Sequence, residues 1–170
     1  MIVISSHIFS PFAHHIPAPL HKVRLVLDRH DTLSAAFTEL EAILISIFNV
    51  ERVYIFQYRK QQQSLTLHFN STSFAPHIHL PISPASIAGY VALSQHSLIV
   101  SDPYDEKVLS AINPSLRFND QFDQQCTERT RNILCIPILQ QDTLVGVLQL
   151  INTIDNFTYD ISLGEDVAEL

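Results

Sequence analysis

Two apolar runs joined by a short polar link constrain this chain most. The runs are Ile133–Leu139 and Leu144–Ile151, and the link is Gln140–Thr143. This arrangement is typical of a β-hairpin. Side chains alternate across a strand, so the second run divides into two sets: Leu144, Gly146, Leu148 and Leu150 on one face, and Val145, Val147, Gln149 and Ile151 on the other. Both sets are largely apolar, and we expect the hairpin to be the middle of a sheet covered on both faces.

The flanking sequence predicts the covering helices and the other strands. Apolar residues recur at helical spacing in Leu20–Arg29 and in Thr32–Phe48, and Asp31 is a good N-cap for the second helix. Alternating or β-branched stretches predict further strands at Arg52–Arg59, Ser64–Asn70, His77–Ile82 and Ser97–Ser101. Ser83 followed by Pro84 is typical of a helix start.

A long connection separates the last two predicted strand groups. Asp102–Asn132 contains no strand pattern, and we expect it to form a lid with short helices at Asp105–Ile112 and Phe122–Arg131. After the hairpin, Thr153–Gly164 is polar, and a helical pattern begins just before Leu170. We therefore expect an N-terminal arm at residues 1–19 and a single domain at 20–170, cut from a longer protein.

Composition excludes several classes of function. The chain has 170 residues, 46% of them apolar, and a net charge of −7 with its ten Lys and Arg scattered, which disfavours nucleic acid and anionic membranes as partners. Cys126 and Cys135 show no CxxC spacing and indicate free thiols in a reducing compartment. The apolar N-terminus lacks the basic start of a signal peptide and is too short to span a membrane, so we expect a cytoplasmic location.

No enzyme signature is present, and we expect no catalytic residue, metal or cofactor. The chain lacks GxSxG, HExxH and a phosphate-binding glycine loop. His68, His77 and His79 could approach one another, but a solvent-facing set of imidazoles is the favoured interpretation. The lid carboxylates Asp120, Asp123 and Glu128 are interpreted as a solvated acidic surface.

The parts of a small-molecule pocket are present. A helix N-terminus near Ser86 has free amides that could bind an oxygen, and aromatic lid residues could stack on a planar group. The aromatic candidates are Tyr104, Phe118 and Phe122, and the polar candidates are Asp102, Asn119 and Thr130. The alternative is a fully packed core without a vacancy.

Several segments, in order, resemble a GAF domain. They are SIAGYVAL at 86–93, IVSDPYD at 99–105, NPSLRFN at 113–119, RTRNILCIPI at 129–138 and LVGVLQLIN at 144–152. The last two resemble GAF domains of cyclic nucleotide phosphodiesterases. The first three are more similar to bacterial GAF domains, including those that precede type II secretion or type IV pilus assembly ATPases.

The resemblance implies an α+β fold with a six-stranded antiparallel sheet, terminal helices on one face, and short lid helices with a pocket on the other. By position, Ser86, Ile87, Ala88 and Gly89 would line the pocket from the helix start. Asp102 and Phe118 would face the ligand, and Thr130 would contact it from the lid helix. Such domains sense a small molecule or form homodimers through their terminal helices, and they regulate an output domain.

Departures from the family pattern argue against a cyclic nucleotide as the ligand. Cys126 stands where nucleotide-binding members have Thr, and Asn152-Thr153 replaces the Asn-Lys of the NKFDE signature. We therefore expect a regulatory, non-catalytic domain with an unidentified ligand. The alternatives are a structural dimerisation module whose pocket is filled by its own side chains, and a small enzyme similar to the GAF-type methionine sulfoxide reductases, which would require a reactive Cys126.

Overall fold

One six-stranded antiparallel sheet forms the centre of the molecule. The computed structural model describes residues 18–31, 33–70, 78–120, 123–125 and 128–153. The strand order is β3-β2-β1-β6-β5-β4, so the two longest strands lie side by side in the middle. The strands are β1 Val50–Arg59, β2 Ser64–Asn70, β3 His79–Pro81, β4 Leu98–Val100, β5 Ile133–Gln140 and β6 Thr143–Thr153.

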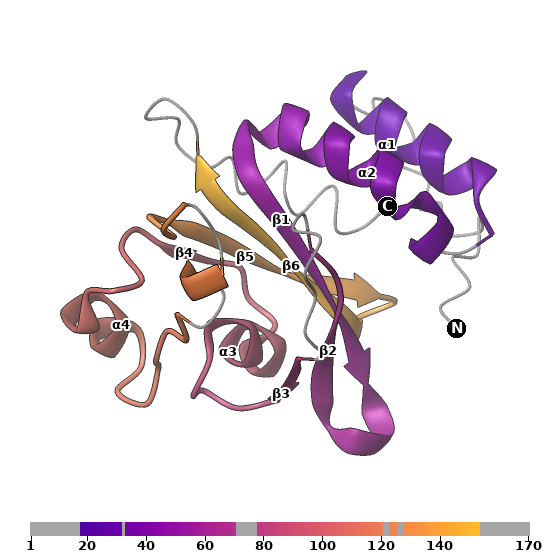
Figure 1. The fold of residues 1–170 in the computed structure, drawn as a ribbon. Helices are drawn as coiled ribbons and strands as arrows, with labels where there is room; N and C mark the ends of the chain where they lie inside the picture. The colour runs from indigo at the N-terminus through magenta and orange to yellow at the C-terminus, as the bar shows by residue number, and fades with distance from the viewer. Residues whose placement is uncertain (1–17, 32, 71–77, 121–122, 126–127, 154–170) are drawn as a thin grey trace.

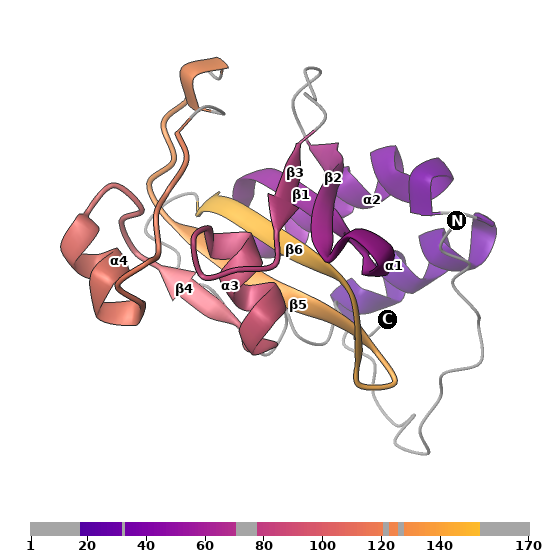
Figure 2. The same cartoon turned by 90° about the horizontal axis from the view of Figure 1, so that it is seen from below.

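The helices cover both faces of this sheet (Figures 1 and 2). The α-helices are α1 Ala18–Arg29, α2 Leu33–Phe48, α3 Ile87–Ser94 and α4 Glu106–Ile112, with short 3₁₀ turns η1 Lys60–Gln62 and η2 Asp123–Gln125. Helices α1 and α2 lie on one face, and α3 and α4 lie on the other (Figure 1). This arrangement confirms the predicted α+β class with terminal helices and short helices on opposite faces.

Each face of the sheet has its own hydrophobic core. Val26 of α1 and Leu44 of α2 pack against Val53 and Leu148 on one face. On the other face, residues of α3 such as Val91 pack on side chains of β1, β5 and β6. Removing apolar surface from water on both sides contributes about 25 cal/mol per Å², and it fixes the register of the central strands because a slip of one residue would exchange the two faces.

The β5–β6 hairpin is confirmed, but one predicted side-chain direction is wrong. The turn consists of Gln141 and Asp142, both with positive φ (48° and 59°), so the loop is shorter than the expected four-residue link. The register then shifts at Ile138/Leu139, because Leu139 pairs with Leu144 and Ile138 pairs with Gly146. This β-bulge places Leu144 in the α3-side core, opposite the face of Leu148.

Helix α3 begins three residues later than the Ser83-Pro84 signal indicates. Ser86 is the N-cap in an extended conformation (φ −133°, ψ 154°), and its Oγ accepts from the Gly89 amide at 3.1 Å. The Arg117 amide donates to Ala85 O at 3.3 Å, which holds the backbone before Ser86 extended and delays the helix. Ser83 Oγ accepts from the Ala85 amide instead.

The predicted helix at Phe122–Arg131 is also not formed as expected. Only the 3₁₀ turn η2 lies in this segment, and residues 121–122 and 126–127 lie outside the described part. Side chains bind the backbone amides here, since the Thr130 amide donates to Asp123 Oδ2 and the Arg131 amide donates to Asn152 Oδ1. These contacts replace helical hydrogen bonds. Helix α4 matches its prediction, with Asp105 as the N-cap.

Gly146 on β6 offers a test of the central sheet. A Cβ at this position would lie 2.5 Å from the backbone oxygen of Phe56 on β1. Neither atom can move away, because each is held directly by the backbone of its strand. We expect Gly146→Ala to reduce the free energy of unfolding by about 2 kcal/mol, measured by urea denaturation. The control is Thr143→Ala, an exposed position on the same strand that should cost about 0.5 kcal/mol. Equal stability of the two variants would contradict this account of the strand packing.

Candidate functional site

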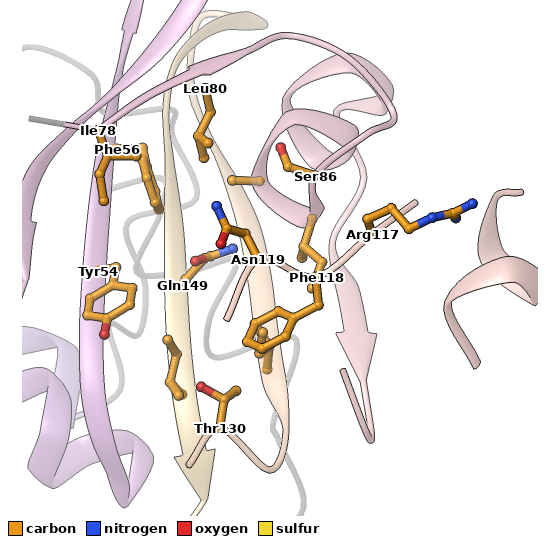
Figure 3. A pocket seen from close by; sticks show the side chains of 14 residues that line it. Tyr54, Phe56, Ile78, Leu80, Ser86, Arg117, Phe118, Asn119, Thr130 and Gln149 are labelled. Carbon is orange, nitrogen blue, oxygen red and sulfur yellow. The ribbon is translucent and has the colours of Figure 1, made fainter. Parts of the chain in front are cut away.

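A pocket of about 90 Å³ opens on the α3 face of the sheet (Figure 3). Its floor consists of side chains from β1, β5 and β6, and its walls come from the start of α3, the β3 segment and residues 117–119. The lining residues are Tyr54, Phe56, Ile78, Leu80, Ser86, Ile87, Ala88, Arg117, Phe118, Asn119, Thr130, Ile133, Gln149 and Ile151. The pocket is thus mostly apolar, with a few polar groups at defined positions, as is usual for small-molecule sites.

The start of α3 supplies hydrogen-bond donors to this pocket. Ser86 Oγ binds the Gly89 amide and Ser86 O accepts from the Tyr90 amide, and the bridge between Ser86 and Arg117 engages the Ile87 amide. Among the described residues, no acceptor binds the amide of Ala88. The first amides of a helix carry partial positive charge. They can bind an acceptor oxygen of a ligand.

Position 89 requires glycine because other backbone segments approach it closely, and not because a ligand contacts it. A Cβ there would lie 2.6 Å from the carbonyl oxygens of both Pro81 and Ser83. Gly89 is buried just behind the pocket wall and is not among the lining residues.

Six of the ten predicted site residues line the pocket: Ser86, Ile87, Ala88, Phe118, Asn119 and Thr130. Asp102 does not, because it is exposed and its Oδ1 accepts from the Tyr104 amide at 2.9 Å in a local turn. Tyr104 supports the wall from behind, with its ring 5.0 Å from that of Phe118 in an edge-on contact. Phe122 lies outside the described residues.

Most of the pocket floor was missed from sequence. Tyr54, Phe56 and Ile133 look like ordinary core residues in the sequence, because the pocket is a gap in the layer above them. Two polar residues in apolar strands carried a usable signal. Gln149 in β6 and Arg52 in β1 are only 8% and 6% exposed, and a buried polar side chain needs a partner or a function.

The carboxylate of Asp123 joins the segment before β5 to the sheet. Arg52 Nη1 donates to Asp123 Oδ1 at 3.3 Å, and both side chains are almost fully buried. Thr130 donates to the same carboxylate twice, from its amide at 2.7 Å and its hydroxyl at 2.6 Å. Arg52 Nη2 also donates to Thr130 Oγ1 at 2.8 Å, and the Tyr104 hydroxyl donates to Asp123 Oδ2 at 2.6 Å. This network therefore holds Thr130 in the pocket wall.

The network changes the acidity of its members. Burial tends to raise the pKa of Asp123, but the bonds from Thr130 and Tyr104 and the charge of Arg52 outweigh it, so the pKa lies below the ordinary aspartate value. Burial and the hydrogen bond to Asp123 raise the pKa of Tyr104 to about 12. Asp123 is therefore ionised at neutral pH and Tyr104 is a neutral donor.

A second network ties the end of β6 to the loop that carries Thr130. Asn152 is fully buried with φ 58°, and its Oδ1 accepts from the Arg131 amide at 2.6 Å. Its Nδ2 donates to Arg129 O at 2.9 Å and to Glu51 Oε2 at 2.6 Å. Arg131 Nη2 donates to the other oxygen of Glu51 at 2.7 Å. A strained backbone held by this many bonds joins the pocket loop and β6 into one unit.

The histidines considered above do not meet within the described part of the chain. His79 is exposed and its Nδ1 lies 3.2 Å from Thr66 Oγ1. His77 and the side chain of His68 lie outside the described residues. Among the residues the structure describes, no group of three or more His, Cys, Asp or Glu could hold a metal ion.

Comparison with known proteins identifies the family. The model of the GAF domain matches residues 31–170, and the chain therefore belongs to the GAF domain family, as the resemblance had indicated. A relative in Caenorhabditis elegans, a probable 3',5'-cyclic phosphodiesterase pde-5, is 35% identical over 69 residues. That match covers 41% of this chain and 8% of the relative, so the chain corresponds to a small part of that protein.

Solved structures with this fold include domains of a phosphotransferase and of a chemotaxis protein. The GAF domain of the Acinetobacter phosphoenolpyruvate-protein phosphotransferase has a TM-score of 0.65 and 13% identity, covering 91% of this chain and 90% of that one. Residues 122 to 287 of a methyl-accepting chemotaxis protein have a TM-score of 0.64 and 15% identity, with 86% and 89% covered. At such identities the likeness shows the fold.

The expectation that the domain is non-catalytic is wrong as an inference from this fold. A free methionine-R-sulfoxide reductase from Neisseria meningitidis has a TM-score of 0.66 and 16% identity, covering 89% of this chain and 81% of that one. Structures of fRMsr of Staphylococcus aureus are also similar. The GAF fold therefore includes enzymes. In this chain Cys135 is fully buried, and burial raises its pKa to about 12, while Cys126 lies outside the described residues.

None of the helices in the described residues is long and apolar enough to cross a membrane.

The lowered pKa of Asp123 predicts an acid-sensitive wall of the pocket. A carboxylate whose pKa is lower in the folded state stabilises the fold above its unfolded pKa of about 4 and loses this contribution as pH falls through the folded pKa. We expect Asp123→Asn to cost about 3 kcal/mol at pH 7, because it leaves Arg52 buried without its counter-charge. The difference from wild type should shrink below pH 4, measured by urea denaturation from pH 7 to pH 3.

The matched control is Asp120→Asn, an exposed carboxylate on the same segment. Its stability should follow that of the wild type across the whole range. A constant difference between Asp123→Asn and wild type at every pH would show that the carboxylate charge does not stabilise the fold.

Proposed function

We propose that this chain is a regulatory GAF domain that binds a small molecule in the pocket under α3. The observation that carries the proposal is the pocket itself, which combines the free amide of Ala88 with the rings of Phe56 and Phe118. A structural module filled by its own side chains would have no such opening. A lined vacancy with polar groups at its edge favours ligand binding over that alternative.

The two hydrogen-bond networks support a route from the pocket to the rest of the protein. Thr130 lines the pocket, and its neighbours Arg129 and Arg131 are bonded to Asn152 at the end of β6. A ligand that shifts the Thr130 wall would therefore displace the end of β6, and its differential affinity for the two positions would set the response. We propose that this displacement regulates an attached output domain, such as a signalling enzyme or a secretion ATPase.

A thermal-shift screen tests ligand binding. The panel contains cyclic mononucleotides, cyclic dinucleotides, purines and small carboxylates. A ligand at a hundred times its Kd should add about 2.7 kcal/mol to the free energy of unfolding. Ala88→Leu should abolish the shift by filling the pocket, whereas Asp102→Ala, an exposed position outside the pocket, should retain it. The absence of a shift with every class would favour the structural module.

We further propose that the domain forms homodimers through its terminal helices. Leu25 on α1 is 48% exposed, while Val23 and Val26 of the same helix are buried. An apolar side chain on the outer surface of α1 can pack against the same helix of a second copy.

Light scattering during gel filtration tests the dimer. We expect the wild type to show the mass of two chains, and Leu25→Glu to show a single chain because it would bury unpaired charges at the interface. The control is Leu93→Glu, which changes an exposed leucine on α3, on the other side of the sheet. A monomeric wild type at high concentration would overturn the proposal.

A further inference from the structure

Tyr104 contacts the two walls of the pocket that come from connecting segments. We call residues 117–119 the Phe118 wall and residues 128–131 the Thr130 wall, because Phe118 and Thr130 line the cavity (Figure 3). The Tyr104 ring lies 5.0 Å from the Phe118 ring, with an angle of 64° between the two planes. Tyr104 does not line the cavity itself. It therefore supports the Phe118 wall from the side away from the pocket.

The Thr130 wall reaches the same side chain through two groups. The Tyr104 hydroxyl donates at 2.6 Å to Asp123, whose carboxylate accepts from the amide and the hydroxyl of Thr130. The Arg129 guanidinium carbon lies 3.8 Å from the centre of the Tyr104 ring, which is the geometry of a cation–π contact. Arg129 O also accepts from Asn152 Nδ2 at 2.9 Å. The wall that binds Tyr104 is thus bonded to the end of β6.

The backbone of Tyr104 is held independently of both walls. Its amide donates to Asp102 Oδ1 at 2.9 Å, and the Asp105 amide donates to Asp102 O at 3.3 Å, in the turn between β4 and α4. Only the side-chain torsions of Tyr104 remain to be ordered. Contact with one wall fixes these torsions, so contact with the other wall forms without that entropy cost. The two walls stabilise each other because they share this side chain.

We propose that Tyr104 couples the two walls, so that they open and close together. A ligand that contacts only the Phe118 wall then also changes the Thr130 wall and, through Arg129, the end of β6. Tyr104 is a positioning residue, since it acts through the residues that line the pocket. The effect of a ligand rests on the proposed function, whereas the coupling itself is measured without a ligand.

Native-state hydrogen exchange of the ¹⁵N-labelled chain, followed by NMR, measures this coupling. The Arg117 amide is bonded to Ala85 O at 3.3 Å and reports opening of the Phe118 wall. The Thr130 amide is bonded to Asp123 Oδ2 at 2.7 Å and reports opening of the Thr130 wall. Leu148 lies in β6, between β1 and β5, and its amide reports unfolding of the whole domain.

Truncation of one wall should change exchange at the other. We expect Phe118→Ala to speed exchange of the Thr130 amide by about threefold or more, because the Tyr104 ring loses a contact that fixes it. Tyr104→Leu should speed exchange at both reporter amides, and in its presence Phe118→Ala should have no further effect on Thr130. The matched control is Leu139→Ala, which truncates a partly buried residue of the same core at the far end of β5 and should leave Thr130 exchange unchanged.

Arg129 provides the reciprocal measurement. Its side chain is exposed, so Arg129→Ala removes the cation over the Tyr104 ring without disturbing the core. Because coupling acts in both directions, this variant should speed exchange of the Arg117 amide by about twofold. Lys107→Ala removes an exposed cation of α4 and should leave Arg117 exchange unchanged.

Three results would overturn the inference. The first is a wild-type rate of Thr130 exchange in Phe118→Ala, and the second is an acceleration that persists when Tyr104→Leu is also present. The third is equal acceleration of the Leu148 amide in both Phe118→Ala and Arg129→Ala, which would show a general loss of stability. None of these results bears on ligand binding, which the thermal-shift screen tests separately, and a screen without shifts would leave the coupling intact.

Discussion

The burial of the central strands on both faces determines the rest of this structure. Strands β1, β5 and β6 pack against α1 and α2 on one side and against α3 on the other, and nearly every side chain of β6 from Gly146 to Thr153 is buried. Hydrophobic burial on two faces leaves no freedom of register. A pocket can then form only where one covering layer is incomplete. In this chain the gap lies beside the start of α3, so residues of the helix start and of the sheet line the same cavity.

The floor and the wall of the pocket are stabilised by different chemistry. Apolar side chains such as Phe56 and Ile133 form most of the floor, and their packing is insensitive to pH. The Thr130 wall depends on a buried pair of charges, Arg52 and Asp123, whose desolvation cost is offset by the bonds from Thr130 and Tyr104. A network of this kind defines one arrangement of the wall rather than adding much net stability.

Features that depend on local periodicity could be predicted from the sequence. Features that depend on pairing with another segment of the chain could not. The β5–β6 hairpin and the helix α2 follow from local patterns, and they were predicted nearly to the residue. The side of Leu144 was missed because a bulge is set by pairing with the neighbouring strand. The start of α3 was displaced to Ser86 because Arg117, far along the chain, holds the preceding backbone extended.

The same distinction applies to the candidate site. Ser86, Ile87 and Ala88 were found because a helix start is a local signal, and they do line the pocket. Asp102 lies outside because its carboxylate is used in a turn with Tyr104. Gln149 and Arg52 were overlooked, although each interrupts an apolar strand. Asp123, the partner of Arg52, is far away in the sequence, and only the folded chain brings the two together, whereas Cys135 is paired with Gln149 within the predicted hairpin.

The left-handed backbone of Asn152 has a practical consequence for protein engineering. Its side chain joins the loop at Arg129–Asn132, one wall of the pocket, to the last residues of β6. Under the proposed function, movement of the pocket wall would therefore reach the end of β6 through the Asn152 side chain. A fluorescent reporter attached at the end of β6 would therefore report whether the pocket is occupied or empty.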